Sequence, residues 1–221
     1  MSQQVKISKK RNGYYYIENL ELPSITKVIG EVIAKPALIY WIKREAIRLA
    51  LKHPELNEKE VITLLDLQLR QTQERGHYVH SIAEIMPNID ISKTKKEYLG
   101  YIIGLKGWWD KEKPNILYRE IEAFNTKIGY GCRVDFVCDI RGETWNIDFK
   151  SSAKGIIYKE VGLQNIAGKL ALKETYNIEV KHMGVVALSE TGEDTFKETN
   201  DTEEDLIHLI GMYNWIKRKG D

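Results

Sequence analysis

The stretch from 131 to 152 constrains the fold of this chain more than any other part of the sequence. Two runs rich in β-branched and aromatic residues, 131–140 and 144–152, flank a short segment that contains a glycine. Such a pattern predicts a β-hairpin. Apolar and polar side chains alternate within each run, so each strand is expected to have one apolar face and one polar face.

The register of this hairpin brings two acidic side chains together. If Arg141-Gly142 is a two-residue turn, the strands pair so that Asp135 lies directly opposite Asp148. A four-residue loop centred on the same bond gives the same register, whereas a three-residue loop does not. Opposed carboxylates repel each other across roughly 5 Å between Cβ atoms. A cation is therefore expected between them, either Lys150, which shares the face of Asp148, or a divalent metal ion.

This acidic pair resembles the catalytic core of the PD-(D/E)XK nuclease superfamily. The resemblance rests on Asp135 and, on the next strand, Asp148-Phe149-Lys150. The context Arg-Val-Asp and Ile-Asp-Phe-Lys-Ser-Ser is similar to the RecB-like branch, which includes phage and mitochondrial exonucleases. The resemblance implies that both aspartates and the main-chain carbonyl of Phe149 hold a metal ion, with Lys150 acting in catalysis. The alternative is a surface hairpin that carries Asp and Lys for solubility.

A second part of the resemblance lies in a predicted helix over 58–86. Gly76 and His80 occupy the places of a Gly-x-x-x-His motif, which implies that the glycine lets the helix approach the sheet and the histidine reaches the metal. Glu84 lies one turn further on the same face and is an additional candidate. A single helical histidine is more often a core or surface residue, and that alternative stays open. His77 is predicted to lie on a different face, without a role.

Two other segments carry candidate residues. A strand predicted over 116–123 places Glu120 and Glu122 on one face, and the resemblance implies that one such glutamate lies near the metal without choosing between them. A helix predicted over 158–176 contains Gln164, which opens the family's Gln-x-x-x-Tyr motif and would contact phosphate or water. Gly168 stands at the tyrosine place, which puts the tyrosine's function in doubt.

The order of predicted elements indicates an α/β fold. The remaining elements are a hairpin over 5–17, helices from 24, from 36, over 93–113 and over 205–217, and strands over 183–188 and 195–197. Ser24 is predicted to cap the first of these helices and Gly30 to end or loosen it. Trp108 and Trp109 are predicted to be core residues. We expect one nuclease domain over 1–221, with a mainly helical part over 1–113 and a catalytic core over 114–221. The resemblance implies a restriction-endonuclease-like core, a central mixed β-sheet flanked by helices.

The charge distribution and the two cysteines bear on which ligands and cofactors the chain can have. The formal net charge is +1, but residues 1–53 hold ten Lys/Arg against four Asp/Glu, and residues 189–221 hold four against nine. A basic N-terminal part fits nucleic-acid binding if its charges share a face, although solvated helices are an equally common cause. Cys132 and Cys138 are predicted to face the same way in the core, so no disulfide is expected. A related iron–sulfur nuclease needs four cysteines and this sequence has two, so no iron–sulfur cluster is expected.

No stretch approaches the roughly 18 apolar residues of a membrane helix, and the first residues lack the apolar centre of a signal peptide. A cytoplasmic protein without a membrane partner is therefore expected. The resemblance to phage exonucleases also fits a phage-encoded protein that acts in the host cytoplasm.

The candidate residues and the resemblance together imply a deoxyribonuclease that depends on Mg²⁺ or Mn²⁺. The resemblance implies an exonuclease that needs a free, single-stranded DNA end, in phage DNA metabolism or in recombination and repair. A histidine ligand should make Mn²⁺ an able substitute for Mg²⁺. Two alternatives stay open: a structure-specific endonuclease of the junction-resolvase type on the same core, and a nucleic-acid-binding subunit without catalysis.

Overall fold

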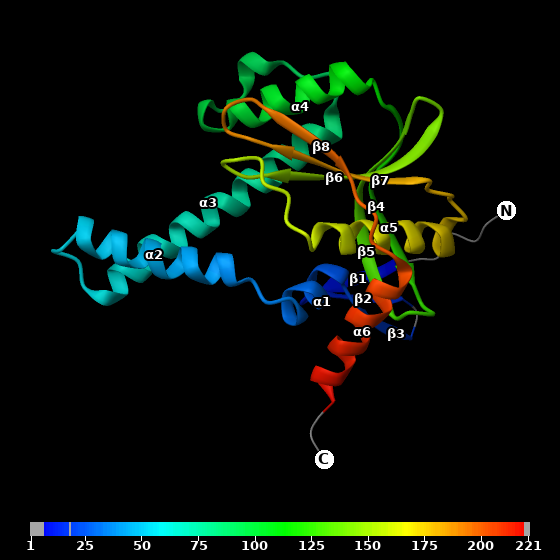
Figure 1. Ribbon diagram of the computed structural model, residues 1–221, viewed down its shortest axis with the longest axis horizontal. Coiled ribbons are helices and arrows are strands. Elements are labelled where there is room, and N and C mark those ends of the chain that lie inside the picture. The colour runs from blue at the N-terminus through cyan, green and yellow to red at the C-terminus, as the bar shows by residue number, and fades with distance from the viewer. Residues whose placement is uncertain (1–6, 18, 219–221) are drawn as a thin grey trace.

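A computed structural model describes residues 7–17 and 19–218 (Figure 1). Its centre is a five-stranded mixed sheet in the order β4-β5-β6-β7-β8. Helix α4 packs on one face of the sheet and helix α5 on the other. The strands are β4 (Asn115–Asn125), β5 (Tyr130–Ile140), β6 (Glu143–Ser151), β7 (His182–Leu188) and β8 (Asp194–Glu198). The predicted α/β fold with a central mixed sheet is confirmed.

The central hairpin forms as predicted. Arg141 and Gly142 have φ angles of 59° and 83°, and positive φ at both central residues is the signature of a type I′ turn. The strands β5 and β6 pair in the predicted register as far as Phe136 opposite Ile147. Strand β6 then pairs in parallel with β7, and α5 (Val161–Tyr176) makes the crossover between them.

The alternation predicted for β5 fails between Val134 and Phe136. Cys132 and Val134 pack with Val137 in the apolar layer that includes α5, whereas Phe136 and Cys138 pack in the layer that includes α4. The two cysteines therefore lie in different layers, and the prediction that they face the same way is wrong. Both sides of β5 contribute to the core, so the strand does not have a single apolar face.

The neighbouring strand supplies the physical reason. The pairing of β4 with β5 shifts by one residue between Ile116 and Tyr118, and Glu120 takes a left-handed φ of 46° in the middle of the strand. A bulge and a left-handed residue both bend a strand and change the direction of its side chains. A prediction that side chains alternate regularly through this segment therefore assigns some of them to the wrong face of the sheet.

The N-terminal segment forms a small separate sheet of β1 (Ile7–Arg11), β2 (Tyr14–Ile17) and β3 (Leu20–Pro23). The predicted hairpin is present, with residues 5 and 6 outside the described range, while β3 was not anticipated. Helix α1 (Ile25–Val32) begins at Ser24, whose hydroxyl accepts a hydrogen bond from the Lys27 amide at 3.2 Å. This confirms the predicted cap, but Gly30 lies within the helix and does not end it.

Helices α2 (Pro36–Lys52) and α3 (Glu58–Ile85) form an arm that projects from the sheet (Figure 1). We define the arm as residues 36–70. It has its own apolar cluster of Leu49, Val61 and Leu65. The second half of α3 returns to the sheet, where Val79 and Ala83 join the layer beneath α4. One helix thus belongs to both the arm and the sheet.

The remaining helices close the two apolar layers. Helix α4 (Leu99–Glu112) starts later than predicted, because residues 91–98 form two short 3₁₀ turns. Its Trp108 and Trp109 are buried, as predicted for core residues. Helix α6 (Glu203–Lys217) packs on α1 and α5. No helix within the described ranges combines the length and apolar character needed to span a bilayer.

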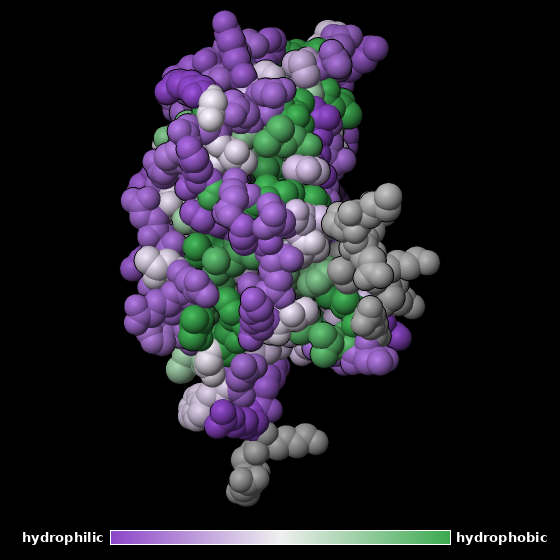
Figure 2. Space-filling view, turned by 90° about the vertical axis from the view of Figure 1, so that its right-hand side faces the viewer, coloured by the Kyte–Doolittle hydropathy of each residue, from purple (hydrophilic) through white to green (hydrophobic). Residues whose placement is uncertain are grey.

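The side of the molecule turned away from the arm is shown in Figure 2. Hydrophilic side chains cover most of it, and apolar ones form a broken strip between them. The cavity that holds the candidate residues lies elsewhere, next to α3.

Candidate metal and catalytic site

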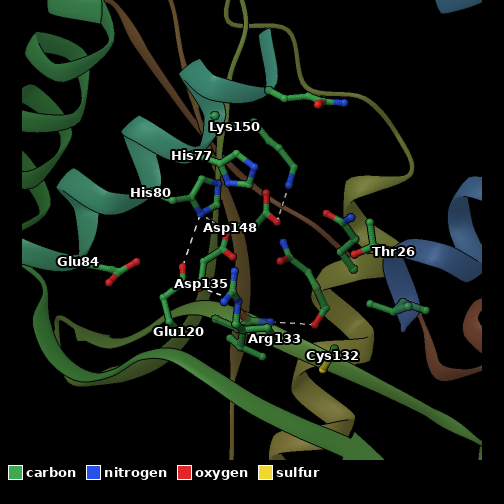
Figure 3. Close-up of a pocket in the computed structure, with 17 residues that line it drawn as sticks. Thr26, His77, His80, Glu84, Glu120, Cys132, Arg133, Asp135, Asp148 and Lys150 are labelled. Atoms are coloured by element: carbon green, nitrogen blue, oxygen red, sulfur yellow. Dashed lines mark hydrogen bonds and ion pairs between the residues drawn. The ribbon is translucent and has the colours of Figure 1, made fainter. Parts of the chain in front are cut away.

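A cavity of about 500 Å³ collects most of the predicted site residues (Figure 3). Its walls come from the first turn of α1, the second half of α3, the strands β4 to β6 and the start of α5. The predicted residues that line it are His80, Glu84, Glu120, Asp135, Asp148, Lys150 and Gln164. Residues far apart in the sequence therefore meet at one place.

Asp135 and Asp148 stand where the β5–β6 register continues beyond its last paired residues. The carboxylate of Asp135 accepts a hydrogen bond at 3.3 Å from the backbone amide of Phe149. Burial and the negative charge of Asp148 raise the pKa of Asp135 to about 6. The pair therefore carries the repulsion that the sequence predicts for opposed carboxylates, and a bound cation would relieve it.

Lys150 is one cation at this pair. Its Nζ lies 2.7 Å from Asp148 Oδ1. Burial alone would lower the pKa of Lys150, but the charges of Asp148 and Asp135 outweigh it and the pKa is raised. Lys150 is thus a fixed ammonium group. The other oxygen, Asp148 Oδ2, is buried and has no hydrogen-bond partner among the described residues, so one strong acceptor remains for a ligand.

His80, Glu120 and Asp135 form a second group, on the other side of the pair. His80 Nδ1 lies 3.5 Å from Asp135 Oδ2 and 3.6 Å from Glu120 Oε1. One ligand atom from each of the three residues lies within 4.8 Å of the others. Burial opposes protonation of His80, but Glu120, Asp135 and Asp148 outweigh it and raise its pKa.

This donor set fits a divalent cation. Carboxylate oxygens are the ligands that Mg²⁺ and Mn²⁺ prefer, and an imidazole nitrogen suits Mn²⁺ better than Mg²⁺. The unsatisfied Asp148 Oδ2 adds a buried oxygen to the group. Which of these atoms would complete the coordination depends on the ion.

Glu120 occupies the site, whereas Glu122 does not line the cavity. The left-handed φ of Glu120 directs its carboxylate toward His80, and Arg133 Nε lies 2.8 Å from its second oxygen. A non-glycine residue in this conformation costs roughly 1 kcal/mol or more, and such residues concentrate at functional sites. The bend in β4 therefore places Glu120, and not Glu122, at the cavity, whereas the sequence alone did not distinguish the two glutamates.

Helix α5 contributes Gln164 but has no room for a tyrosine at 168. A Cβ atom added to Gly168 would lie 2.6 Å from Asn146 Nδ2 and 3.0 Å from Val134 Cγ2. Asn146 is itself buried and donates a hydrogen bond at 2.9 Å to the carbonyl of Asn165. Gly168 is thus a close-packing position against the sheet, where a larger side chain would collide with Asn146 and Val134.

The α3 side of the cavity corrects two sequence-based expectations. Gln73, His77, His80 and Glu84 all line the cavity, at spacings of four, three and four residues. Such positions follow one face of a helix, so His77 does not lie on a different face from His80. A Cβ at Gly76 would meet nothing within 4 Å. This glycine therefore leaves space in the cavity and does not mediate close packing on the sheet.

Besides His77, the sequence reasoning missed Arg133 and Asn146 as cavity residues. Each lies two positions before a predicted residue on the same strand, Arg133 before Asp135 and Asn146 before Asp148. Their places on the strands were the available signal. The backbone N–H of Phe149 contacts Asp135, while its predicted carbonyl ligation stays a prediction.

No family model and no curated protein matches the chain. Among solved structures, a protein named SSO0001 aligns with a TM-score of 0.39 and 13% identity over 78% of this chain and 71% of its own. A protein from Eubacterium rectale, provisionally named an exonuclease, aligns with a TM-score of 0.40 and 12% identity over 65% of this chain. The aligned part spans 64% of that protein, just under two thirds of its length.

Proposed function

We propose that this protein is a metal-dependent nuclease that hydrolyses phosphodiester bonds in DNA. The observation that carries the proposal is the meeting of His80, Glu120 and Asp135 with Asp148 and Lys150 in one cavity. This set combines hard ligands for a divalent cation with a fixed ammonium group. Its members come from α3, β4, β5 and β6, so the chance meeting of surface charges is a poor explanation.

Asp135, Asp148 and His80 would hold Mg²⁺ or Mn²⁺, with the Phe149 carbonyl and Glu120 as further oxygen donors. The ion would supply a water that is nucleophilic at neutral pH and would neutralise charge on the phosphate. Lys150 Nζ is held 2.7 Å from Asp148 Oδ1, so it would hold or polarise the attacking water and donate to a phosphate oxygen. Gln164 and Glu84 would orient the water or the phosphate.

The arm offers a surface for nucleic acid. Its helix α2 exposes four cations, and Tyr40 and Trp41 are 66% and 39% exposed beside them. The cations are Lys43, Arg44, Arg48 and Lys52. Basic side chains with interleaved aromatic rings are typical of single-strand binding. We therefore propose an exonuclease that takes a single-stranded DNA end, with the whole chain acting as one nuclease domain in recombination, repair or phage DNA metabolism.

The proposal is tested by digesting end-labelled linear DNA and covalently closed single-stranded circles with Mg²⁺, Mn²⁺ or EDTA. Linear single strands should be degraded with either metal, circles should survive, and EDTA should stop cleavage. Efficient cutting of circles would favour the structure-specific endonuclease instead. Binding of DNA without cleavage in any metal would favour the non-catalytic subunit.

Lys150→Ala should lower the rate of cleavage far more than the affinity for DNA. Its charge acts where negative charge develops in the transition state, and loss of one such group typically costs about 100-fold or more in kcat. Steady-state kinetics and fluorescence anisotropy with labelled single strands separate the two quantities. Lys154→Ala, in the exposed loop after β6, is the matched control. Equal losses in rate and affinity would make Lys150 only a phosphate contact.

A further inference from the structure

We propose that His77 is a second functional histidine of this cavity, which binds a phosphate group of the substrate and does not hold the metal. The inference rests on the proposed nuclease function and assigns its two helical histidines different tasks. His80 belongs to the carboxylate group, whereas His77 faces the incoming nucleic acid.

The position of His77 supports this division. Figure 3 shows its imidazole inside the cavity, on the side of His80 that faces Lys150. Glu84 lies on the opposite side of His80 along the same helix face. The group of residues able to hold a metal contains His80 but not His77. His77 therefore stands next to the metal-binding group without belonging to it.

Most basic side chains of the cavity already have acidic partners. Lys150 pairs with Asp148 at 2.7 Å, and Arg133 pairs with Glu120 at 2.8 Å. His80 lies between Asp135 and Glu120. His77 is exposed, and the described residues give it no hydrogen bond or ion pair. Of the two histidines on this face of α3, His77 is thus the one whose imidazole remains available to a ligand.

Carboxylates outnumber permanent cations in the lining of the cavity. Its lining carries four carboxylates, on Glu84, Glu120, Asp135 and Asp148, against Arg133 and Lys150. A phosphodiester entering this space needs donors that the carboxylates do not already occupy. An imidazole N–H directed into the cavity satisfies that need, and its hydrogen bond to an anionic oxygen is of the charge-assisted kind. The ligand class is the phosphate backbone of a nucleic acid.

The test compares His77→Ala, His77→Lys and His80→Ala with the wild type in two assays. One is cleavage of labelled single-stranded DNA, with kcat and KM determined separately. The other is Mn²⁺ titration of the metal-free protein by electron paramagnetic resonance. His208→Ala is the matched control, because His208 is an exposed histidine of α6 far along the chain from this cavity.

His77→Ala should raise KM at least about tenfold, the lower end of what a hydrogen bond to a charged group contributes, and leave the Mn²⁺ titration unchanged. His77→Lys should stay near the wild-type KM because it keeps an N–H donor at this position. A fall in Mn²⁺ affinity equal to that of His80→Ala would make His77 a metal ligand and overturn the inference. An unchanged KM in His77→Ala would overturn it as well.

Failure of the proposed function would look different. A wild-type protein that cleaves no DNA refutes the nuclease proposal, and anisotropy with the same oligonucleotide then decides on His77. About tenfold weaker binding by His77→Ala would still support the phosphate contact. Equal binding by both proteins, or no binding by either, would overturn it.

Discussion

Asp148→Asn is expected to reduce metal-dependent DNA cleavage by about a thousandfold or more, while the protein melts at the wild-type temperature or above it. The loss follows because the substitution removes a proposed oxygen ligand and the partner that holds Lys150 at 2.7 Å. Both the activation of water and the stabilisation of developing charge depend on these groups, and each is worth several kcal/mol of barrier.

The stability of the variant follows from the charges around Asp148. Burial and the Asp148 charge hold the pKa of Asp135 at about 6. Removing the neighbouring charge lowers that pKa, so Asp135 ionises fully at neutral pH and takes over as the partner of Lys150. One repulsion disappears and no buried charge is left alone, so the free energy of unfolding should not fall.

The measurements are cleavage of single-stranded DNA with Mg²⁺ and thermal melting of the metal-free protein. Asp110→Asn is the control, because Asp110 forms only a surface pair with Lys106 and should change neither quantity. Cleavage by Asp148→Asn at the wild-type rate, or by the wild type in EDTA, would refute the assignment of the site.

His80→Ala should give a stable protein whose activity is strongly reduced and partly restored by raising the metal concentration. The carboxylates would still hold an ion, and Mg²⁺ readily keeps water in place of a protein ligand. Mn²⁺ gains more from imidazole, so it should lose more affinity. Loss of a metal-site partner typically costs about 10- to 100-fold in affinity or activity.

Activity measured against Mg²⁺ and Mn²⁺ concentration, together with melting curves, checks this prediction. The advantage of Mn²⁺ over Mg²⁺ should become smaller in the variant. His53→Ala, at the end of α2, is the matched control, and its metal curves should equal those of the wild type. A structural histidine would behave otherwise: His80→Ala would melt at a lower temperature and keep an unchanged metal curve.

The parts of this fold that local chemistry determines could be predicted from the sequence. The Arg141-Gly142 turn fixes the hairpin register, because positive φ at both residues closes a two-residue loop in only one way. The register then places Asp135 beside Asp148, with Lys150 on the same side. The cap at Ser24 and the burial of Trp108 and Trp109 follow equally from local pattern.

Other parts depend on irregularities that no periodic pattern contains. The bulge between Ile116 and Tyr118 and the left-handed Glu120 change the faces of β4 and β5. They separate Glu120 from Glu122 and send the two cysteines into different layers. A glycine is needed at 168 because α5 approaches Asn146 closely, and that approach depends on tertiary packing. His77 is a different case, since its three-residue spacing from His80 was visible in the sequence.

One helix, α3, runs from the arm to the cavity and connects the two. Helix α3 has 28 residues, so it is a rod about 42 Å long, and α2 is attached chiefly to this rod. Arg75 donates to the carbonyl of Ser151 at 3.2 Å and lies over the ring of Tyr101. This contact lies between the arm and the part of α3 that carries His77, His80 and Glu84. The carboxylates of Asp135 and Asp148 belong to the strands β5 and β6. A rotation of α3 about this contact would therefore change the distance of 3.5 Å between His80 Nδ1 and Asp135 Oδ2, and with it the spacing of two of the groups proposed to hold the metal.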